Sequence, residues 1–185
     1  MPERIANIFV LAEDIEQQNL VRRYMENCGH NLRSCRFDRP AQGPSGSGEK
    51  YVRDQYPKQV QACRSAIGRR ASALLVIIID SDMETTQHRA EQLADALEAA
   101  GMQPRDDGEP IVVLIPKRHV ETWIRALLGN QADEQIDYKK PQPIASDIRN
   151  AAEILHRWTR RGAGPGPTSP PSLTASLPQW RKIPS

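Results

Sequence analysis

The stretch LLVIIIDSD at residues 74–82 decides the fold of this chain. Six aliphatic residues, four of them β-branched, run directly into two carboxylates spaced by one residue. A continuous run of this kind predicts a strand buried on both faces, which is typical of a parallel sheet. Ligands of open α/β sheets bind just beyond the carboxyl ends of the strands. Asp80 and Asp82 are expected at such an end and on one face, because strand side chains repeat every two residues.

Strands and helices alternate on both sides of this stretch. Apolar runs predict the strands, and apolar residues at helical spacing predict the helices. The expected strands are 5–12, 32–37, 74–79 and 111–115, and the expected helices are 15–28, 57–70, 90–101, 120–128 and 144–160. This alternation predicts a doubly wound α/β fold, with a mostly parallel sheet of about four strands and helices on both of its faces.

The composition predicts one folded domain and a tail. A chain of 185 residues is usually a single domain. In residues 162–185, 13 of 24 residues are Pro, Gly or Ser. Such a segment buries too little apolar surface to offset its ordering entropy, so we predict an α/β domain at 1–161 and a disordered tail at 162–185.

Charge and cysteine content restrict the function classes. The tail holds two of the 25 basic residues and none of the 23 acidic ones, so the predicted domain is neutral and does not resemble a generic basic nucleic-acid binder. The three cysteines form no CxxC pair, and no cationic leader precedes an apolar segment. The longest apolar run is too short to span a membrane. We therefore expect a reduced, cytoplasmic protein without a membrane partner.

Acidic side chains follow the ends of other expected strands too. Glu13 and Asp14 follow the first apolar run, and Glu121 follows the run at 111–115. Carboxylates gathered on one face repel each other unless a cation lies between them. The alternatives are one helix-capping and one solvated carboxylate in the D-x-D pair, and a helix-dipole role for Glu121. The candidate metal ligands are Glu13, Asp80, Asp82 and Glu121.

Three basic residues precede Glu121. Lys117, Arg118 and His119 form the most concentrated cationic segment near the acids, and they are the candidate phosphate- or nucleic-acid-binding residues. Lys117 is also a candidate catalytic residue. His119 is a possible general base, although a lone His at a helix N-terminus is more often structural or solvated.

The segment GPSGSGEK at 43–50 superficially matches a phosphate-binding P-loop. That motif requires Lys directly after its second Gly and then Ser or Thr. Here Glu49 follows Gly48, Tyr51 follows Lys50, and no buried strand leads into the loop. We interpret the segment as a flexible, substrate-facing loop.

The order of these acids resembles a Toprim domain, the catalytic fold of topoisomerases, bacterial primases and OLD-type nucleases. Glu13 resembles its strand-end Glu, and Asp80 and Asp82 resemble its Asp-x-Asp. Glu121, in IPKRHVETWI, is similar to a third acidic position of small stand-alone OLD-like proteins, and Lys117 is the nearest candidate for their lysine. The resemblance spans roughly residues 5 to 130. Many Toprim domains have Gly after the first Glu, and this chain has Asp14.

The resemblance implies a Mg²⁺- or Mn²⁺-dependent nuclease or phosphodiesterase acting on DNA or RNA. It also implies a possible ABC- or AAA-class ATPase partner and a role in phage defence. The residues favour the same cations independently, because carboxylate oxygens are hard ligands. Two such ions activate water and stabilise the leaving oxygen of a phosphodiester.

Two other functions remain open. The segment FVLAEDIEQQNLVRRYMENCGH is similar to the opening of a response regulator, in which paired acids hold Mg²⁺ beside a phosphorylatable Asp, here Asp80. The long gap from Asp14 to Asp80, the missing Ser or Thr after 111–115 and the missing fifth strand disfavour this class. The third possibility is a non-catalytic adaptor, whose tail or Trp180 docks on a partner.

Overall fold

Four parallel strands form a single sheet in the computed structural model, which describes residues 5–41, 47–160, 162, 164–167 and 169–185. The strand order is β2-β1-β3-β4. The strands are β1 (Asn7–Ala12), β2 (Cys35–Asp38), β3 (Ala73–Ile78) and β4 (Ile111–Leu114). The predicted all-apolar strand is β3, which lies between β1 and β4, and all six of its residues are buried. The α/β class and the parallel sheet are confirmed.

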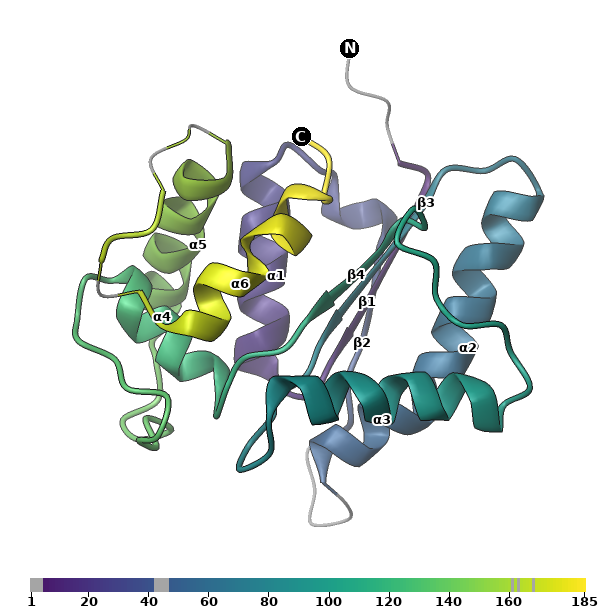
Figure 1. Ribbon diagram of the computed structural model, residues 1–185. Helices are drawn as coiled ribbons and strands as arrows, with labels where there is room; N and C mark the ends of the chain where they lie inside the picture. The colour runs from purple at the N-terminus through teal and green to yellow at the C-terminus, as the bar shows by residue number, and fades with distance from the viewer. Residues whose placement is uncertain (1–4, 42–46, 161, 163, 168) are drawn as a thin grey trace.

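Helices cover both faces of the sheet (Figure 1). The first face carries α1 (Ile15–Asn27), α4 (Val120–Leu127), α5 (Ala145–Arg160) and α6 (Pro171–Arg181). The second face carries α2 (Gly48–Gly68) and α3 (Thr86–Ala99), and a short 3₁₀ helix η1 (Leu32–Ser34) precedes β2. Alternate strand residues divide between two cores, as the period of two requires: Ile8 and Val10 pack with α1, and Phe9 and Leu11 pack with α2.

The order in which strands join the sheet changes side between β1 and β3. The chain adds β2 on one side of β1 and then crosses back to add β3 and β4 on the other side. The pairing of β1 with β3 runs from Asn7 opposite Ala73 to Ala12 opposite Ile78, so these two strands end together. A switch point of this kind opens a crevice at the carboxyl ends of the strands, where α/β proteins bind ligands.

Helix α2 begins earlier than predicted. The expected helix opened at Pro57, but the observed helix starts at Gly48 and contains Pro57. The apolar stripe formed by Val52, Tyr56 and Val60 is buried across the proline. The free energy gained by burying this stripe offsets the loss of the backbone hydrogen bond that Pro57 cannot donate.

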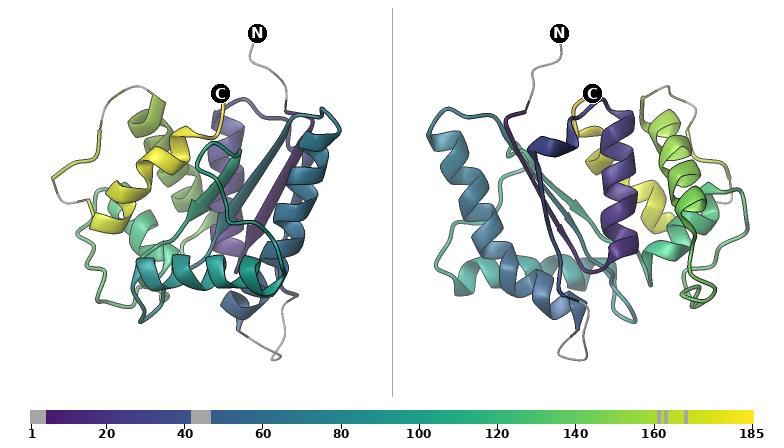
Figure 2. Two further views of the ribbon diagram at one scale, coloured as in Figure 1. Left: turned by 45° about the vertical axis from the view of Figure 1, so that its right-hand side comes forward. Right: turned by 180° about the vertical axis from the view of Figure 1, so that it is seen from behind.

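The prediction of a disordered tail is wrong from Pro171 onward. Residues 171–181 form α6, and Leu173, Leu177, Trp180 and Ile183 are each 0–2% exposed. These side chains belong to the same core as those of α1 and α5, and Figure 2 shows α6 beside these helices. The apolar positions 173, 177 and 180 follow helical spacing, so the segment does have a face to bury. The predicted boundary residue, 161, lies outside the described residues.

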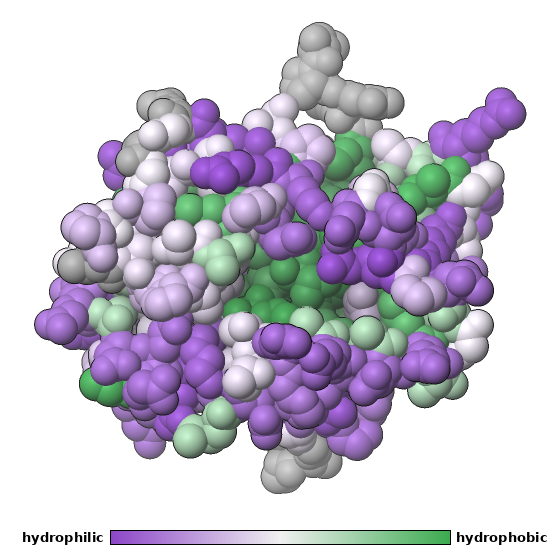
Figure 3. Space-filling model, in the orientation of Figure 1, coloured by the Kyte–Doolittle hydropathy of each residue, from purple (hydrophilic) through white to green (hydrophobic). Residues whose placement is uncertain are grey.

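The outer edge of β4 lies between α3 and α6. Figure 3 shows apolar side chains at the bottom of a hollow on this face. The hollow includes a cavity of about 280 Å³ lined by Val113, Ile115, Ala90 and Gln179 among others. Gln179 of α6 accepts a hydrogen bond from the backbone N–H of Val113 at 3.4 Å, so α6 partly protects this edge. None of the helices in the described ranges combines the length and the apolar character needed to cross a membrane.

Candidate functional site

Glu13 and Asp80 meet at the switch point of the sheet. Glu13 follows β1, Asp80 follows β3, and Oε2 of Glu13 accepts a hydrogen bond from the backbone N–H of Asp80 at 3.1 Å. Because the two strands are neighbours that end in register, the loops after them begin side by side. The predicted convergence of these two acids is therefore observed.

The Asp80 carboxylate is completely buried and poorly compensated. Its side chain is 0% exposed, and neither oxygen has a hydrogen bond of normal geometry within the described residues. Burial raises the pKa of Asp80 well above its usual range, and Asp14 and then Glu121 raise it further. The Gln17 amide lies near enough to lower this pKa in part. A buried carboxylate without full compensation is costly, so this position is one where a bound cation would be stabilising.

The start of α1 fixes the position of Glu13. Asp14 caps the helix by accepting from the backbone N–H of Gln17 at 2.8 Å. The buried Gln17 side chain in turn accepts from the backbone N–H of Glu13 at 2.9 Å. This arrangement is a variant of the capping box, in which the third helical residue bonds back to the chain before the cap. The D-x-x-Q spacing at 14–17 was the sequence signal for it.

Two loops are joined beyond the strand ends and carry the other acids. The backbone N–H of Ser81 donates to Pro116 at 2.9 Å, and that of Asp82 donates to Arg118 at 3.1 Å. Both Asp82 and Arg118 have positive φ, 50° and 70°. An Asp tolerates this conformation better than an Arg. The joined loops hold Asp82 beside His119, the residue before the first turn of α4, whose side chain makes no capping hydrogen bond.

His119 lies between the two aspartates. Its Nδ1 is 3.5 Å from Oδ2 of Asp80 and 3.5 Å from Oδ1 of Asp82, while Nε2 is 3.8 Å from Asp137. The side chain is nearly buried. Burial and then the Lys139 ammonium hold the pKa of His119 below its ordinary value, so the imidazole is neutral at pH 7. A neutral imidazole can donate or accept a proton but cannot neutralise the carboxylates.

The remaining predicted ligands lie at the rim of this cluster. Glu121, in the first turn of α4, is 5% exposed, and its Oε2 has no hydrogen-bond partner in the part of the chain that the structure describes. Burial and then Asp14 raise its pKa. Asp82 is more exposed. Arg89 lies 3.6 Å from its Oδ2 and also forms an ion pair with Glu49 at 2.6 Å.

The pKa of Glu13 is raised to about 8 by burial, by Asp80 and then by Asp82.

Lys139 is the cation that sequence reasoning missed. It is half-buried in the loop between α4 and α5. Burial alone would lower its pKa, but the surrounding carboxylates, Asp80 and Asp82 first, hold it above its ordinary value. Lys139 stands in a proline-rich segment without helical or strand periodicity, so no pattern in the sequence connects it with the acids.

Lys117 and Arg118 contact the loop that follows Asp82. The Lys117 ammonium donates to the carbonyl of Glu84, and the Arg118 guanidinium contacts the sulfur of Met83. Their predicted phosphate-binding role therefore has no direct geometric support, whereas His119 from the same segment does lie in the site. The positive φ of Arg118 turns the chain between these residues.

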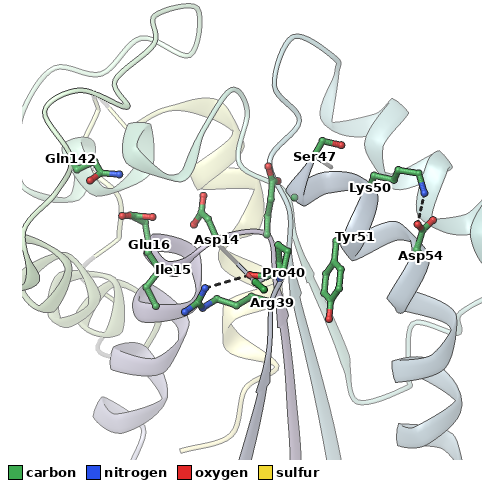
Figure 4. Close-up of a pocket in the computed structure, with 13 residues that line it drawn as sticks. Asp14, Ile15, Glu16, Arg39, Pro40, Ser47, Lys50, Tyr51, Asp54 and Gln142 are labelled. Atoms are coloured by element: carbon green, nitrogen blue, oxygen red, sulfur yellow. Dashed lines mark hydrogen bonds and ion pairs between the residues drawn. The ribbon is translucent and has the colours of Figure 1, made fainter. Parts of the chain in front are cut away.

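A cavity of about 540 Å³ opens beside Glu13 (Figure 4). It lies between the first turns of α1 and α2, and its lining includes Glu16, Arg39, Lys50 and Tyr51. We refer to it as the β1 cavity. Of the predicted loop at 43–50, Ser47, Gly48 and Lys50 line this cavity, and residues 43–46 lie outside the described residues. The loop prediction is wrong for residues 48–50, which form the first turn of α2.

Gly48 allows this close packing. A Cβ atom at this position would overlap the Glu13 side chain and would lie 2.8 Å from the Glu13 carbonyl oxygen, which is closer than real Cβ contacts come. The absence of a side chain at the start of α2 therefore lets this helix approach the end of β1 and hold Glu13 in place.

The donor atoms fit a hard divalent cation, but the ligand shell is not preformed. Carboxylate oxygens suit Mg²⁺ or Mn²⁺, and Asp80 and Glu121 present buried oxygens without hydrogen bonds. Within the described ranges, however, no three His, Cys, Asp or Glu side chains are arranged to hold a metal ion as they stand. Cation binding would therefore require side-chain rotation around Asp80.

Comparisons with known proteins give no relative for this chain. No family model matches it, and neither a curated protein nor a solved structure matches it.

Proposed function

We propose that the acid cluster binds Mg²⁺ or Mn²⁺ and that the protein hydrolyses phosphodiester bonds of DNA or RNA. The observation that carries this proposal is the wholly buried Asp80 carboxylate, which lacks normal hydrogen bonds and lies beside Glu13 at the switch point of a parallel sheet. The Toprim-like order of Glu13, Asp80 and Asp82 supports the same chemistry.

Each residue has a definite part in this proposal. Asp80 and Glu13 would be the inner ligands, with Asp82 and Glu121 at the rim. When bound, a divalent cation holds phosphate oxygens and lowers the pKa of its water. Lys139 would offset charge that develops on the phosphate. His119, held neutral between the aspartates, is placed to accept or donate a proton.

The test is cleavage of plasmid DNA and of single-stranded RNA by the purified chain with Mg²⁺, Mn²⁺ or EDTA. We expect cleavage with a divalent cation, none in EDTA, and at least a hundredfold loss in Asp80→Asn and Glu13→Gln. Asp95→Asn is the matched control, because Asp95 is an exposed carboxylate of α3. If Asp80→Asn cleaves as fast as this control, the proposal is wrong.

A second candidate is a receiver-like phosphoacceptor. The strand order β2-β1-β3-β4 is the order of flavodoxin-like signalling domains, and Lys139 supplies a lysine beside Asp80 without a fifth strand among the described residues. Against it, Asp80 is 0% exposed and offers little access to a phosphodonor. Incorporation of phosphate at Asp80 from a small phosphodonor, without nucleic-acid cleavage, would favour this function.

A non-catalytic adaptor is the remaining possibility. It predicts neither cleavage nor phosphorylation, and its partner, such as the ABC- or AAA-class ATPase implied by the Toprim resemblance, would bind equally well to wild type and Asp80→Asn.

A further inference from the structure

Four arginines without carboxylate partners gather around β2. Arg22 of α1, Arg33 of η1 and Arg36 of β2 are exposed, and Arg39 follows directly after β2. None of the four forms an ion pair with a carboxylate in the described part of the chain. We refer to these four residues as the arginine row.

The row follows an open edge of the sheet toward the β1 cavity. Strand β2 is at one end of the strand order, and the right-hand view of Figure 2 shows it facing the viewer between α1 and α2. Arg36 and Arg39 are three residues apart, which in a strand corresponds to roughly 10 Å. Arg39 lines the β1 cavity (Figure 4), and Glu13 lines the same cavity. The row thus leads from the outer surface to Glu13, the member of the acid cluster that lines this cavity.

Aromatic rings position two of these guanidinium groups, one on each face of the sheet edge. Arg22 lies over the Phe37 ring at 5.8 Å on the α1 face, and Arg36 lies over the Phe9 ring at 5.7 Å on the α2 face, so the two groups flank β2. These cation–π contacts restrict the guanidinium groups and leave their N–H donors available to another ligand. By contrast, Arg23, Arg53 and Arg64 are each bound to a glutamate.

The charge of the β1 cavity differs from that of the row. Four acidic side chains, Glu13, Asp14, Glu16 and Asp54, line the cavity, and even without a charge on Glu13 the other three outnumber the two cations. A phosphate would be repelled there in the absence of a divalent cation, but an uncharged base would not. Tyr51 lines the same cavity, and aromatic side chains stack on bases in proteins that bind single strands.

We infer that the arginine row binds the phosphate backbone of a single-stranded nucleic acid whose next nucleotide enters the β1 cavity. This inference rests on the proposed function and specifies its substrate. A flexible strand can follow the row and reach the recessed acids, whereas a stiff duplex cannot place a phosphodiester next to a carboxylate that is 0% exposed. The cavity volume, about 540 Å³, is within the range of nucleotide-sized ligand sites.

The test measures the affinity for a fluorescein-labelled 20-nucleotide single strand. Binding is detected by fluorescence anisotropy in the presence of EDTA, at NaCl concentrations between 50 and 300 mM. Each lost phosphate contact lowers the slope of log K against log salt by about 0.7 for a single strand. Arg33→Gln/Arg36→Gln should therefore lower the slope by about 1.4 and weaken binding about tenfold or more at 100 mM NaCl. The matched control is Arg149→Gln/Arg157→Gln, which removes the same charge from exposed positions of α5.

Several outcomes would overturn the inference: equal losses in both double variants, tighter binding of the corresponding duplex, or no binding of the single strand at 50 mM NaCl. Because the measurement is made in EDTA, it does not depend on cleavage. Row-dependent binding without metal-dependent cleavage would support the arginine row and reject the proposed catalytic function. Cleavage without row-dependent binding would support the proposed catalytic function and reject the arginine row.

Discussion

The backbone N–H of Asp80 donates to Oε2 of Glu13 at 3.1 Å, although the two residues are 67 positions apart in the sequence. A hydrogen bond from a backbone N–H lowers the pKa of a carboxyl group, but here burial and the Asp80 charge outweigh it and raise the pKa of Glu13 to about 8. Without a bound cation, the Glu13 carboxyl group is therefore protonated at neutral pH. This relationship leads to the first two predictions.

The first prediction is that Mn²⁺ stabilises the protein through Asp80. At a hundredfold excess over Kd, a ligand of the folded state adds about 2.7 kcal/mol to the free energy of unfolding, which for a chain of this size raises Tm by about 5–10 °C. Asp80→Asn should remove this shift, whereas the exposed-site control Asp95→Asn should keep it. Thermal melts with Mn²⁺ and with EDTA measure the difference. A full shift in Asp80→Asn would place the cation elsewhere.

The second prediction concerns pH in the presence of EDTA. The unfolded Glu13 carboxyl loses its proton near its ordinary pKa of 4.5, while the folded one keeps it until about 8. Between these values the folded state binds more protons, so the free energy of unfolding falls as pH rises and is lowest above pH 8. Glu13→Gln should reduce this fall by at least about 1.4 kcal/mol, the equivalent of one pKa unit.

Urea denaturation at pH 6 and pH 9 measures the effect. Glu153→Gln on the exposed side of α5 is the control and should follow the wild-type pH dependence. If the wild type were as stable at pH 9 as at pH 6, Glu13 would not be a buried acid with a raised pKa.

The third prediction concerns the contact between α2 and Glu13. Gly48→Ala would place a Cβ 2.8 Å from the Glu13 carbonyl oxygen, so one of the two segments must move. Overpacking of this kind costs about 1–3 kcal/mol, and the displaced Glu13 should weaken Mn²⁺ binding at least tenfold. Gly68→Ala in the same helix is the control, because nothing lies within 4 Å of its Cβ position. Equal stability and equal Mn²⁺ affinity of the two variants would reject the packing role of Gly48.

The parts of the site that can be predicted from the sequence are those whose conformation depends on neighbouring residues. The apolar run at 74–79 and its following acids were enough to predict a buried parallel strand and a carboxylate at its end, because both depend on neighbouring residues. The meeting of Asp80 with Glu13 also needs β1 beside β3, and strand order depends on the packing of the whole chain. Lys139 reaches the acids from a loop without any pattern, so its position follows from tertiary structure alone.

The contacts of Lys117 and Arg118 also depend on tertiary structure. Both precede Glu121 in the sequence, but the Lys117 ammonium donates to the carbonyl of Glu84 and Arg118 has a positive φ, so their phosphate-binding role stays a prediction. The prediction of a disordered tail rests on its Pro, Gly and Ser content. That content concealed the helical spacing of Leu173, Leu177 and Trp180, whose burial is sufficient to order α6.

The last prediction is that α6 is essential for stability. Trp180 is 0% exposed, its ring centroid lies 4.7 Å from that of Tyr24, and its carbonyl accepts from the Tyr24 hydroxyl at 3.1 Å. At the other end of the helix, Ser172 accepts from Trp123 Nε1 at 2.8 Å and from the backbone N–H of Lys117 at 3.1 Å. The helix is therefore tied both to the core and to the loop that leads to His119.

Trp180→Ala should lower the free energy of unfolding by about 3–5 kcal/mol, the usual cost of removing a buried Trp side chain. Arg181→Ala, at the exposed next position, should change it by no more than about 0.5 kcal/mol. Urea denaturation followed by circular dichroism measures both values. Deletion of residues 171–185 should lower Tm further still, because it exposes Tyr24 and Trp123 and leaves the Trp123 N–H without its partner. A truncated protein that kept the wild-type Tm would show that α6 contributes no packing energy to the domain.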